Sequence, residues 1–223
     1  MRTLFSGEVF VHYGQLSVES TPEGCGGGLA EPFAGQEGGL CGAAVPGGLF
    51  LTTGLHTGDV GFTVELHESE PSLDDSWEEI VEVPFRPLSS QVELLQWAGE
   101  DSWDLDLEEI DYRVRYCATG MEEAQRTEHI LAEEPPVVDR YLLQFWPSPP
   151  RPARVVKQTT ATAAHSHEWA RKLPPPRHRR SGRRRSGPPG GRPSGSAWRR
   201  KRRRGAVGCP ARLCVRSAIT SRA

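Results

Sequence analysis

Clustered carboxylates are the side chains of this sequence that most clearly suggest a chemical role. They concentrate in a first acidic block, residues 65–82, and a second acidic block, residues 100–111. Three uses compete for such clusters: a solvated face, a set of oxygen ligands for calcium, and a negative surface that binds a basic protein. Calcium is disfavoured because neither block contains an EF-hand loop. The carboxylates that we expect to contact a partner are Asp74, Asp75, Glu78, Glu79, Glu100, Asp101, Asp104, Asp106, Glu108 and Glu109.

Residues that would support catalysis or hold a metal are sparse. Seven histidines are present, but none has metal-ligand spacing on an element that would hold it rigid. The run His165-Ser166-His167-Glu168 falls in a stretch that we interpret as a solvated linker. Five cysteines without a Cys-x-x-Cys pair disfavour a disulfide framework and a zinc site, and no phosphate-binding loop, dinucleotide fingerprint or Gly-x-Ser-x-Gly motif occurs. We therefore expect a protein that is not an enzyme and that needs no cofactor and no metal.

The overall net charge of −2 conceals two oppositely charged parts. Residues 1–150 carry 6 Lys and Arg against 28 Asp and Glu, a net charge of −22, whereas residues 151–223 carry 21 against 1, a net charge of +20. A small domain usually carries a net charge of about 2 to 8, so the acidic part needs a function or a partner to explain its charge. Such a surface repels nucleic acid. The expected partner of residues 1–150 is therefore a basic protein.

The elements that must position these carboxylates have a period of two, which is typical of β-strands. In the segment 59–67, Val60, Phe62, Val64 and Leu66 alternate with small or polar residues, as in a strand with one buried face. Further strands are expected over residues 8–13, 15–19, 48–53, 77–85, 92–97, 102–107, 112–116 and 140–146. Short strands separated by turn signals predict an all-β fold, here an antiparallel β-sandwich over about residues 4–148.

Turn residues refine this expectation. Glycines at 54 and 58 predict a hairpin between the strands at 48–53 and 59–67, and residues 98–101 are expected to join the next two strands in the same way. The segment 121–132 is the helical candidate, and we expect it to form no more than one helical turn or a loop. Four tryptophans on or beside the strands are expected to pack in the core. They are Trp77, Trp97, Trp103 and Trp146.

The chain changes character at its Pro-rich segment 147–152, so we expect a domain boundary at residue 150 and a disordered Pro/Arg-rich tail over 151–223. Three interpretations of this tail stay open. The run Arg199–Arg204 binds nucleic acid or serves as a nuclear signal, the tail neutralises the acidic part of the same chain, or residues 174–223 come from a shifted reading frame. A nucleic-acid-associated protein that binds through its tail is the alternative function, and nucleic acid is expected only if the tail is genuine.

No stretch predicts a transmembrane helix. The longest uncharged stretch, Gly38–Gly58, holds seven Gly and one Pro and is too poor in large apolar residues to cross a bilayer. The N-terminal residues show no cleavable signal, because Glu8 precedes any apolar run. A cytoplasmic location is expected.

Five segments carry a resemblance to a known family through the order of their strands, the Val-Pro-Phe strand end and the spacing before the late strand. They are EVFVHYGQLSV at 8–18, LCGAAVPGGLFL at 40–51, VGFTVEL at 60–66, VEVPF at 81–85 and DLDLEEIDYRVRY at 104–116. Over about residues 4–148 the sequence resembles the ComJ family, small bacterial competence-associated inhibitors of a DNA-entry nuclease. The resemblance implies an all-β inhibitor that binds a nuclease, and it transfers no interface residue. The Gly-rich segment 24–39 and the tail depart from it, which leaves the identity of the partner open.

Overall fold

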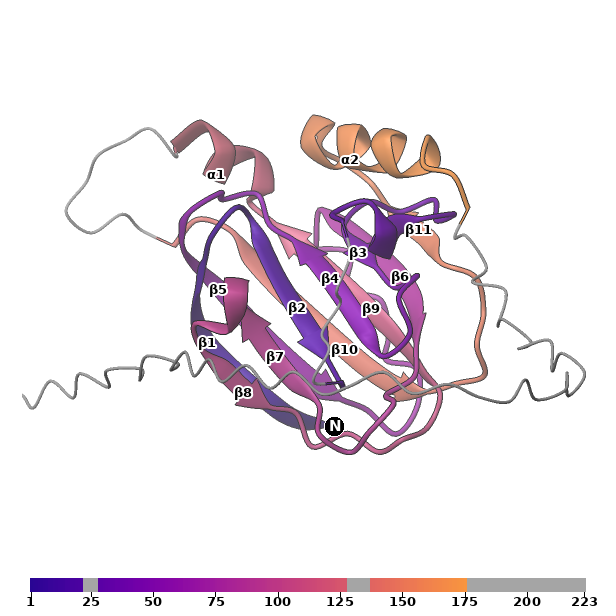
Figure 1. Cartoon of the computed structure of the whole chain (residues 1–223). Helices are drawn as coiled ribbons and strands as arrows, with labels where there is room; N and C mark the ends of the chain where they lie inside the picture. The colour runs from indigo at the N-terminus through magenta and orange to yellow at the C-terminus, as the bar shows by residue number, and fades with distance from the viewer. Residues whose placement is uncertain (22–27, 128–136, 176–223) are drawn as a thin grey trace, which may run out of the picture. The chain divides into compact units, whose positions relative to one another are not determined.

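The structure, a computed structural model, describes residues 1–21, 28–127 and 137–175. Its strands form two sheets, seen as two layers in Figure 1. The six-stranded sheet has the order β1 (Arg2–Val11), β5 (Gly58–Leu66), β10 (Arg140–Pro147), β9 (Tyr112–Thr119), β6 (Glu79–Phe85), β11 (Arg154–Lys157). The five-stranded sheet has the order β3 (Cys41–Gly42), β4 (Gly48–Thr52), β2 (Gln15–Glu19), β7 (Glu93–Gln96), β8 (Ser102–Asp104). The described residues also form the helices α1 (Met121–Thr127) and α2 (Ala161–Arg171) and the short 3-10 helices η1 (Glu31–Phe33) and η2 (Trp97–Gly99).

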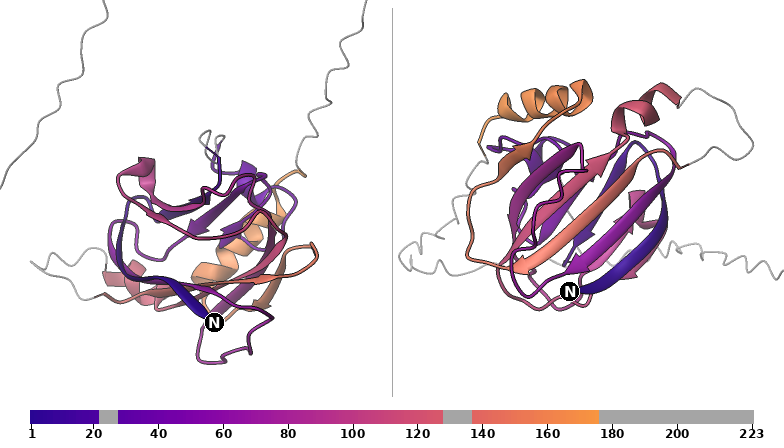
Figure 2. Two further views of the ribbon diagram at one scale, coloured as in Figure 1. Left: turned by 90° about the horizontal axis from the view of Figure 1, so that it is seen from below. Right: turned by 180° about the vertical axis from the view of Figure 1, so that it is seen from behind.

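One hydrophobic core takes residues from both sheets, whose layers face each other in Figure 2. On β5, Val60, Phe62 and Val64 are at most 1% exposed, and on β2 Leu16 and Val18 are buried with them. Alternate residues of a strand point to opposite faces, so each strand contributes one such row. The prediction of a mainly β fold is confirmed.

The described strand pairs are antiparallel, as expected, with one exception. β10 runs parallel to β5, with Arg140 opposite Gly61 at the start of the pairing. The reason is the connection over residues 67–78, which carries the chain back to the end of the sheet where β5 begins, so that β6 runs in the same direction as β5. The strands β10 and β9 lie between β5 and β6, and because β10–β9 and β9–β6 are antiparallel pairs, β10 is parallel to β5. The prediction of a hairpin between the strands at 48–53 and 59–67 is wrong, because these strands lie in different sheets. β4 pairs with β2 and β3, because the turn after it carries the chain from one sheet to the other.

The ordered chain continues past residue 150, where the boundary was expected. β11 pairs with β6, with Arg154 opposite Glu82. Helix α2 follows, and its first turn is capped by the Thr160 side chain, which accepts a hydrogen bond from the Ala163 N–H. β11 and α2 belong to the same compact unit as the other described strands. The first 25 residues of the predicted tail, 151–175, are therefore part of the described structure, and the remainder, 176–223, lies outside the described residues.

The helices lie together at one end of the sheets (Figures 1 and 2), where the Thr162 hydroxyl donates to the Gln125 amide oxygen at 2.8 Å. Helix α1 has seven residues, more than the single turn expected, and the rest of the 121–132 candidate, residues 128–132, lies outside the described residues. Core packing holds for Trp146, which is 2% exposed, but is wrong for Trp97, which is 39% exposed. No helix in the described ranges has the length and apolarity to cross a bilayer.

Candidate functional site

The second acidic block forms an exposed edge of the five-stranded sheet. The expected turn between β7 and β8 is present: Ala98 and Gly99 have φ values of 56° and 67°, and the Gln96 N–H donates to the Asp101 carbonyl at 3.0 Å. Two successive left-handed residues suit a tight hairpin turn. The edge strand β8 and the residues around it carry six exposed carboxylates, which we call the acidic edge. They are Glu100, Asp101, Asp104, Asp106, Glu108 and Glu109.

Few cations neutralise the acidic edge within the described chain. Arg2 Nη1 lies 2.7 Å from Asp106 Oδ2, and Arg2 Nη2 donates to the Asp106 carbonyl at 2.8 Å. His12 Nε2 lies 3.6 Å from Glu100 Oε2. The carboxylates of the edge that form no ion pair with another described residue are Asp101, Asp104, Glu108 and Glu109. Charges on a short edge strand discourage pairing with other chains, and they also leave a surface of negative potential.

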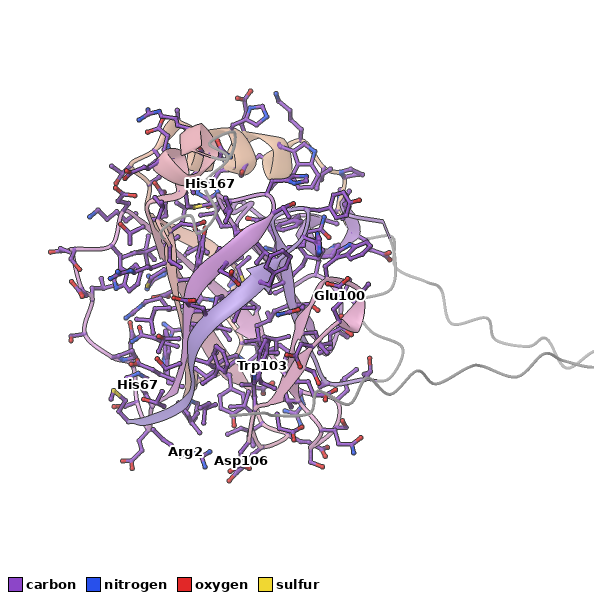
Figure 3. The ribbon with its side chains drawn as sticks, turned by 90° about the vertical axis from the view of Figure 1, so that its left-hand side faces the viewer. Arg2, His67, Glu100, Trp103, Asp106 and His167 are labelled. Atoms are coloured by element: carbon purple, nitrogen blue, oxygen red, sulfur yellow. The ribbon has the colours of Figure 1, made fainter. Side chains whose placement is uncertain are left out.

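A pocket of about 460 Å³ opens at one end of the acidic edge. Figure 3 shows Arg2, His67 and Asp106 at this end of the molecule. The pocket is lined by Met1, Arg2, Leu66, His67, Glu68, Asp106, Glu108, Ile110, Tyr112 and Pro147. The Glu108 N–H donates to the Tyr112 hydroxyl at 3.0 Å, which fixes the backbone beside the pocket. A lining that combines carboxylates with apolar side chains suits a basic side chain, which has an aliphatic stem and a charged head.

The first acidic block lies on the other sheet and meets the second block at the pocket, where Glu68 is in the same lining as Asp106 and Glu108. Asp74 and Asp75 are exposed in the connection between β5 and β6. A hydrogen bond from Ser76 lowers the pKa of Asp74. Glu78 is half-buried and accepts a hydrogen bond from the Gly120 N–H at 2.8 Å.

Glu79 is fully buried, which contradicts its assignment to a partner-binding surface. Its Oε1 accepts hydrogen bonds from the Thr159 and Thr160 N–H groups at 2.9 and 2.7 Å. These bonds hold the start of α2 to β6. Glu79 therefore serves the fold, and of the four contact residues expected in the first block Asp74 and Asp75 are the exposed ones.

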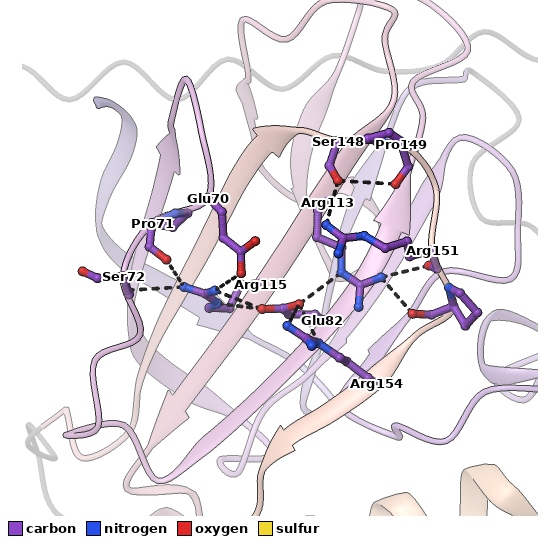
Figure 4. A network of polar contacts seen from close by, with 11 residues as sticks. Glu70, Pro71, Ser72, Glu82, Arg113, Arg115, Ser148, Pro149, Arg151 and Arg154 are labelled. Atoms are coloured by element: carbon purple, nitrogen blue, oxygen red, sulfur yellow. Dashed lines mark hydrogen bonds and ion pairs between the residues drawn. The ribbon is translucent and has the colours of Figure 1, made fainter.

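Glu82 is the centre of a buried ion network on the outer face of the six-stranded sheet (Figure 4). Its side chain is 1% exposed and accepts from Arg113 Nε at 3.2 Å, from Arg115 Nε at 3.0 Å and from Arg154 Nε at 2.9 Å. Burial alone would raise the pKa of Glu82. The hydrogen bonds from Arg115 and Arg113 and the charge of Arg154 outweigh burial, so that the pKa lies below its ordinary value.

The same arginines hold two connecting segments over the sheet (Figure 4). Arg113 Nη1 donates to the carbonyls of Arg151 and Pro152 at 2.9 Å each, and Arg115 Nη1 donates to the Pro71 carbonyl at 2.9 Å. The Arg115 guanidinium also lies 5.1 Å from the centre of the Trp146 ring. β9 is consequently buried on both faces, although its alternation predicted one. This network is structural and leaves no charge for a partner at Glu82.

His167 is buried, so the interpretation of residues 165–168 as a solvated linker is wrong. The Gly39 N–H donates to His167 Nδ1 at 2.9 Å, which joins α2 to the segment before β3. Burial, followed by the charge of Arg171, lowers the pKa of His167 to about 4. The described residues contain no group of three His, Cys, Asp or Glu side chains arranged to hold a metal ion.

Comparisons with known proteins give a distant likeness in fold. No protein-family model and no curated protein matches the chain. Among solved structures, ComJ from Bacillus subtilis, an inhibitor of the DNA degrading activity of NucA, is 17% identical with a TM-score of 0.44, covering 66% of this chain and 98% of ComJ. Crocagin biosynthetic gene J is 15% identical with a TM-score of 0.38, covering 67% of this chain and 100% of its own.

Proposed function

We propose that this chain is a non-catalytic binding protein, a β-sandwich scaffold whose acidic edge binds a basic protein. The partner we propose is a DNA-degrading nuclease, which the chain inhibits. A nuclease groove that binds DNA is lined with cations placed for phosphates, and carboxylates in the same places compete with the phosphates. The sequence resemblance to the ComJ family implies the same function.

The observation that carries the proposal is the exposure of the edge carboxylates without cations. Four of them form no ion pair with another described residue, and the adjoining pocket combines Glu68 and Glu108 with apolar walls beside the Arg2–Asp106 pair. Carboxylates so close together repel one another, and a partner with clustered cations relieves this repulsion while the opposite fields speed the encounter.

The test uses a triple variant that removes charge and no structural contact: Asp104→Asn, Glu108→Gln and Glu109→Gln. Immobilised full-length chain is incubated with a lysate of the source organism, and we expect it to retain a nuclease. The retained nuclease is then purified, and its degradation of DNA is measured with and without the chain. Association rates are measured over a series of salt concentrations. We expect the variant to associate about tenfold more slowly at low salt, and the difference to shrink as the Debye length falls to about 8 Å near physiological ionic strength.

The matched control removes three exposed charges elsewhere: Glu37→Gln, Asp74→Asn and Asp75→Asn. This control should associate at nearly the wild-type rate if the acidic edge is the contact surface. Equal slowing of both triple variants would instead indicate a general effect of net charge. Unchanged inhibition of DNA degradation by the edge variant at low salt would remove the acidic edge from the binding surface.

A further inference from the structure

A group of aromatic rings lies beside the acidic edge, at the end where β1 turns into β2. We call Phe10, His12, Tyr13, His56 and Trp97 the aromatic cluster. The Tyr13 ring centre is 5.2 Å from that of Trp97 and 5.2 Å from that of His56, and the His12 and Trp97 ring centres are 5.8 Å apart. The rings come from three separate segments: the end of β1, the turn after β4 and the turn between β7 and β8.

The cluster is exposed and includes strained backbone. Tyr13 is 55% exposed, Trp97 39% and Phe10 37%. Tyr13 also has a φ of 57°, a left-handed conformation that is unfavourable for a bulky residue and natural for glycine. Tyr13 and Gly14, with φ values of 57° and 61°, form a tight hairpin turn between His12 and Gln15, as Ala98 and Gly99 do between β7 and β8, so the turn accounts for this backbone conformation.

The surroundings of the cluster select a cation. The segments that supply its rings, within 3–20, 43–66 and 87–112, contain no Lys or Arg. Glu100 Oε2 lies 3.6 Å from His12 Nε2 within the cluster, and Asp59 is opposite Phe10 in the β1–β5 pairing. Aromatic faces beside carboxylates are favourable for cations and unfavourable for phosphates.

We propose that the aromatic cluster receives an arginine side chain of the basic partner. A planar guanidinium stacks on the face of Trp97 while it pairs with Glu100, and the Tyr13 ring, tilted by 51° to that of Trp97, borders it. A lysine ammonium is a compact and strongly hydrated charge that gains less from such faces. Because this inference rests on the proposed function, it adds an arginine-selective contact to the charge-driven binding by the acidic edge.

The test measures binding of hexa-arginine, hexa-lysine and an oligothymidylate of similar length to the full-length chain at low ionic strength. The variants are Trp97→Ala and Tyr13→Gly, and the control is Trp169→Ala, because Trp169 is also 39% exposed but lies on α2. We expect hexa-arginine to bind more tightly than hexa-lysine, and each cluster variant to lose about fivefold in affinity for hexa-arginine alone. The control should bind both peptides as the wild type does.

Three outcomes overturn the inference: cluster variants that bind hexa-arginine like the control, equal losses for both peptides, or oligothymidylate binding that depends on Trp97. Thermal unfolding separates binding from stability, because Tyr13→Gly relieves the left-handed strain. Weaker arginine binding with an unchanged or raised Tm supports the inference, whereas a lowered Tm with unchanged binding assigns Tyr13 to the fold. The edge variant Asp104→Asn, Glu108→Gln, Glu109→Gln tests the proposed function separately. If only that variant loses nuclease binding, the proposed function stands and the arginine contact does not.

Discussion

Replacing Glu82 by glutamine tests whether the buried ion network holds the outer face of the six-stranded sheet. Glutamine keeps the size of the side chain, but it removes the negative charge and turns an N–H group toward guanidinium donors. The side chains of Arg113 and Arg115 are 3% and 2% exposed, so neither can recover its hydration. Removing one partner of a buried ion pair costs about 3–5 kcal/mol. We expect a loss near 3 kcal/mol, because Arg115 keeps Glu70 at 3.5 Å and Arg154 is 53% exposed.

The assay is urea unfolding of the full-length chain followed by tryptophan fluorescence. The matched control is Glu109→Gln, the same chemical change at an exposed position, which should change the free energy of unfolding by less than about 0.5 kcal/mol. A loss below about 1 kcal/mol for Glu82→Gln would refute the reasoning, because it would show that the arginines are hydrated or paired elsewhere. Repeating the measurement in acid gives a second check. The lowered pKa of Glu82 means that its stabilisation is complete above its unfolded pKa of about 4.5 and disappears as the pH falls through the folded pKa.

Three further predictions concern the packing of α2 and the core. A Cβ at Gly39 would collide with the Ser166 carbonyl, so Gly39→Ala should destabilise the protein by about 1–3 kcal/mol and increase hydrogen exchange in α2. The lowered pKa of His167 means that its stabilisation is complete above pH 6.5 and is lost as the pH falls toward 4. Urea unfolding at several pH values should show this loss, and it should persist in a His165→Gln variant, which changes an exposed histidine of the same helix. Val64→Asp would place a carboxylate in the core at a fully buried position, and circular dichroism should show loss of the β-sheet signal at room temperature.

Strand positions were predictable because the core lies on one side of most strands. Val60, Phe62 and Val64 alternate in the sequence and are all buried in the structure, and the glycine at position 99 marks the turn between β7 and β8 correctly. The pairing of the strands was harder to predict from the sequence. A glycine-containing turn such as that at Gly54 permits a hairpin, but it equally permits a crossing to the second sheet.

The fate of individual carboxylates was not predictable from their position in an acidic block. Asp75 and Glu79 are four residues apart, yet the first is exposed and the second is fully buried. Glu79 accepts hydrogen bonds from Thr159 and Thr160, which lie 80 and 81 residues further along the chain. One signal was available for Glu82. Two of the few arginines of the acidic part, at positions 113 and 115, occupy one face of a strand, and such a pair needs a buried counter-charge when that face is covered.

The central position of β10 in the six-stranded sheet has a consequence for the order of folding during synthesis. β1 can pair with β5, and β6 with β9, as soon as about the first 119 residues have left the ribosome. These two pairs cannot join until β10, ending at Pro147, is inserted between them. Until then β5 and β9 each present an open strand edge, which is a site for pairing with other chains. Contacts so distant in the sequence also close slowly. The nascent protein thus passes through a stage of exposed edges that ends only when the strand between them has been made.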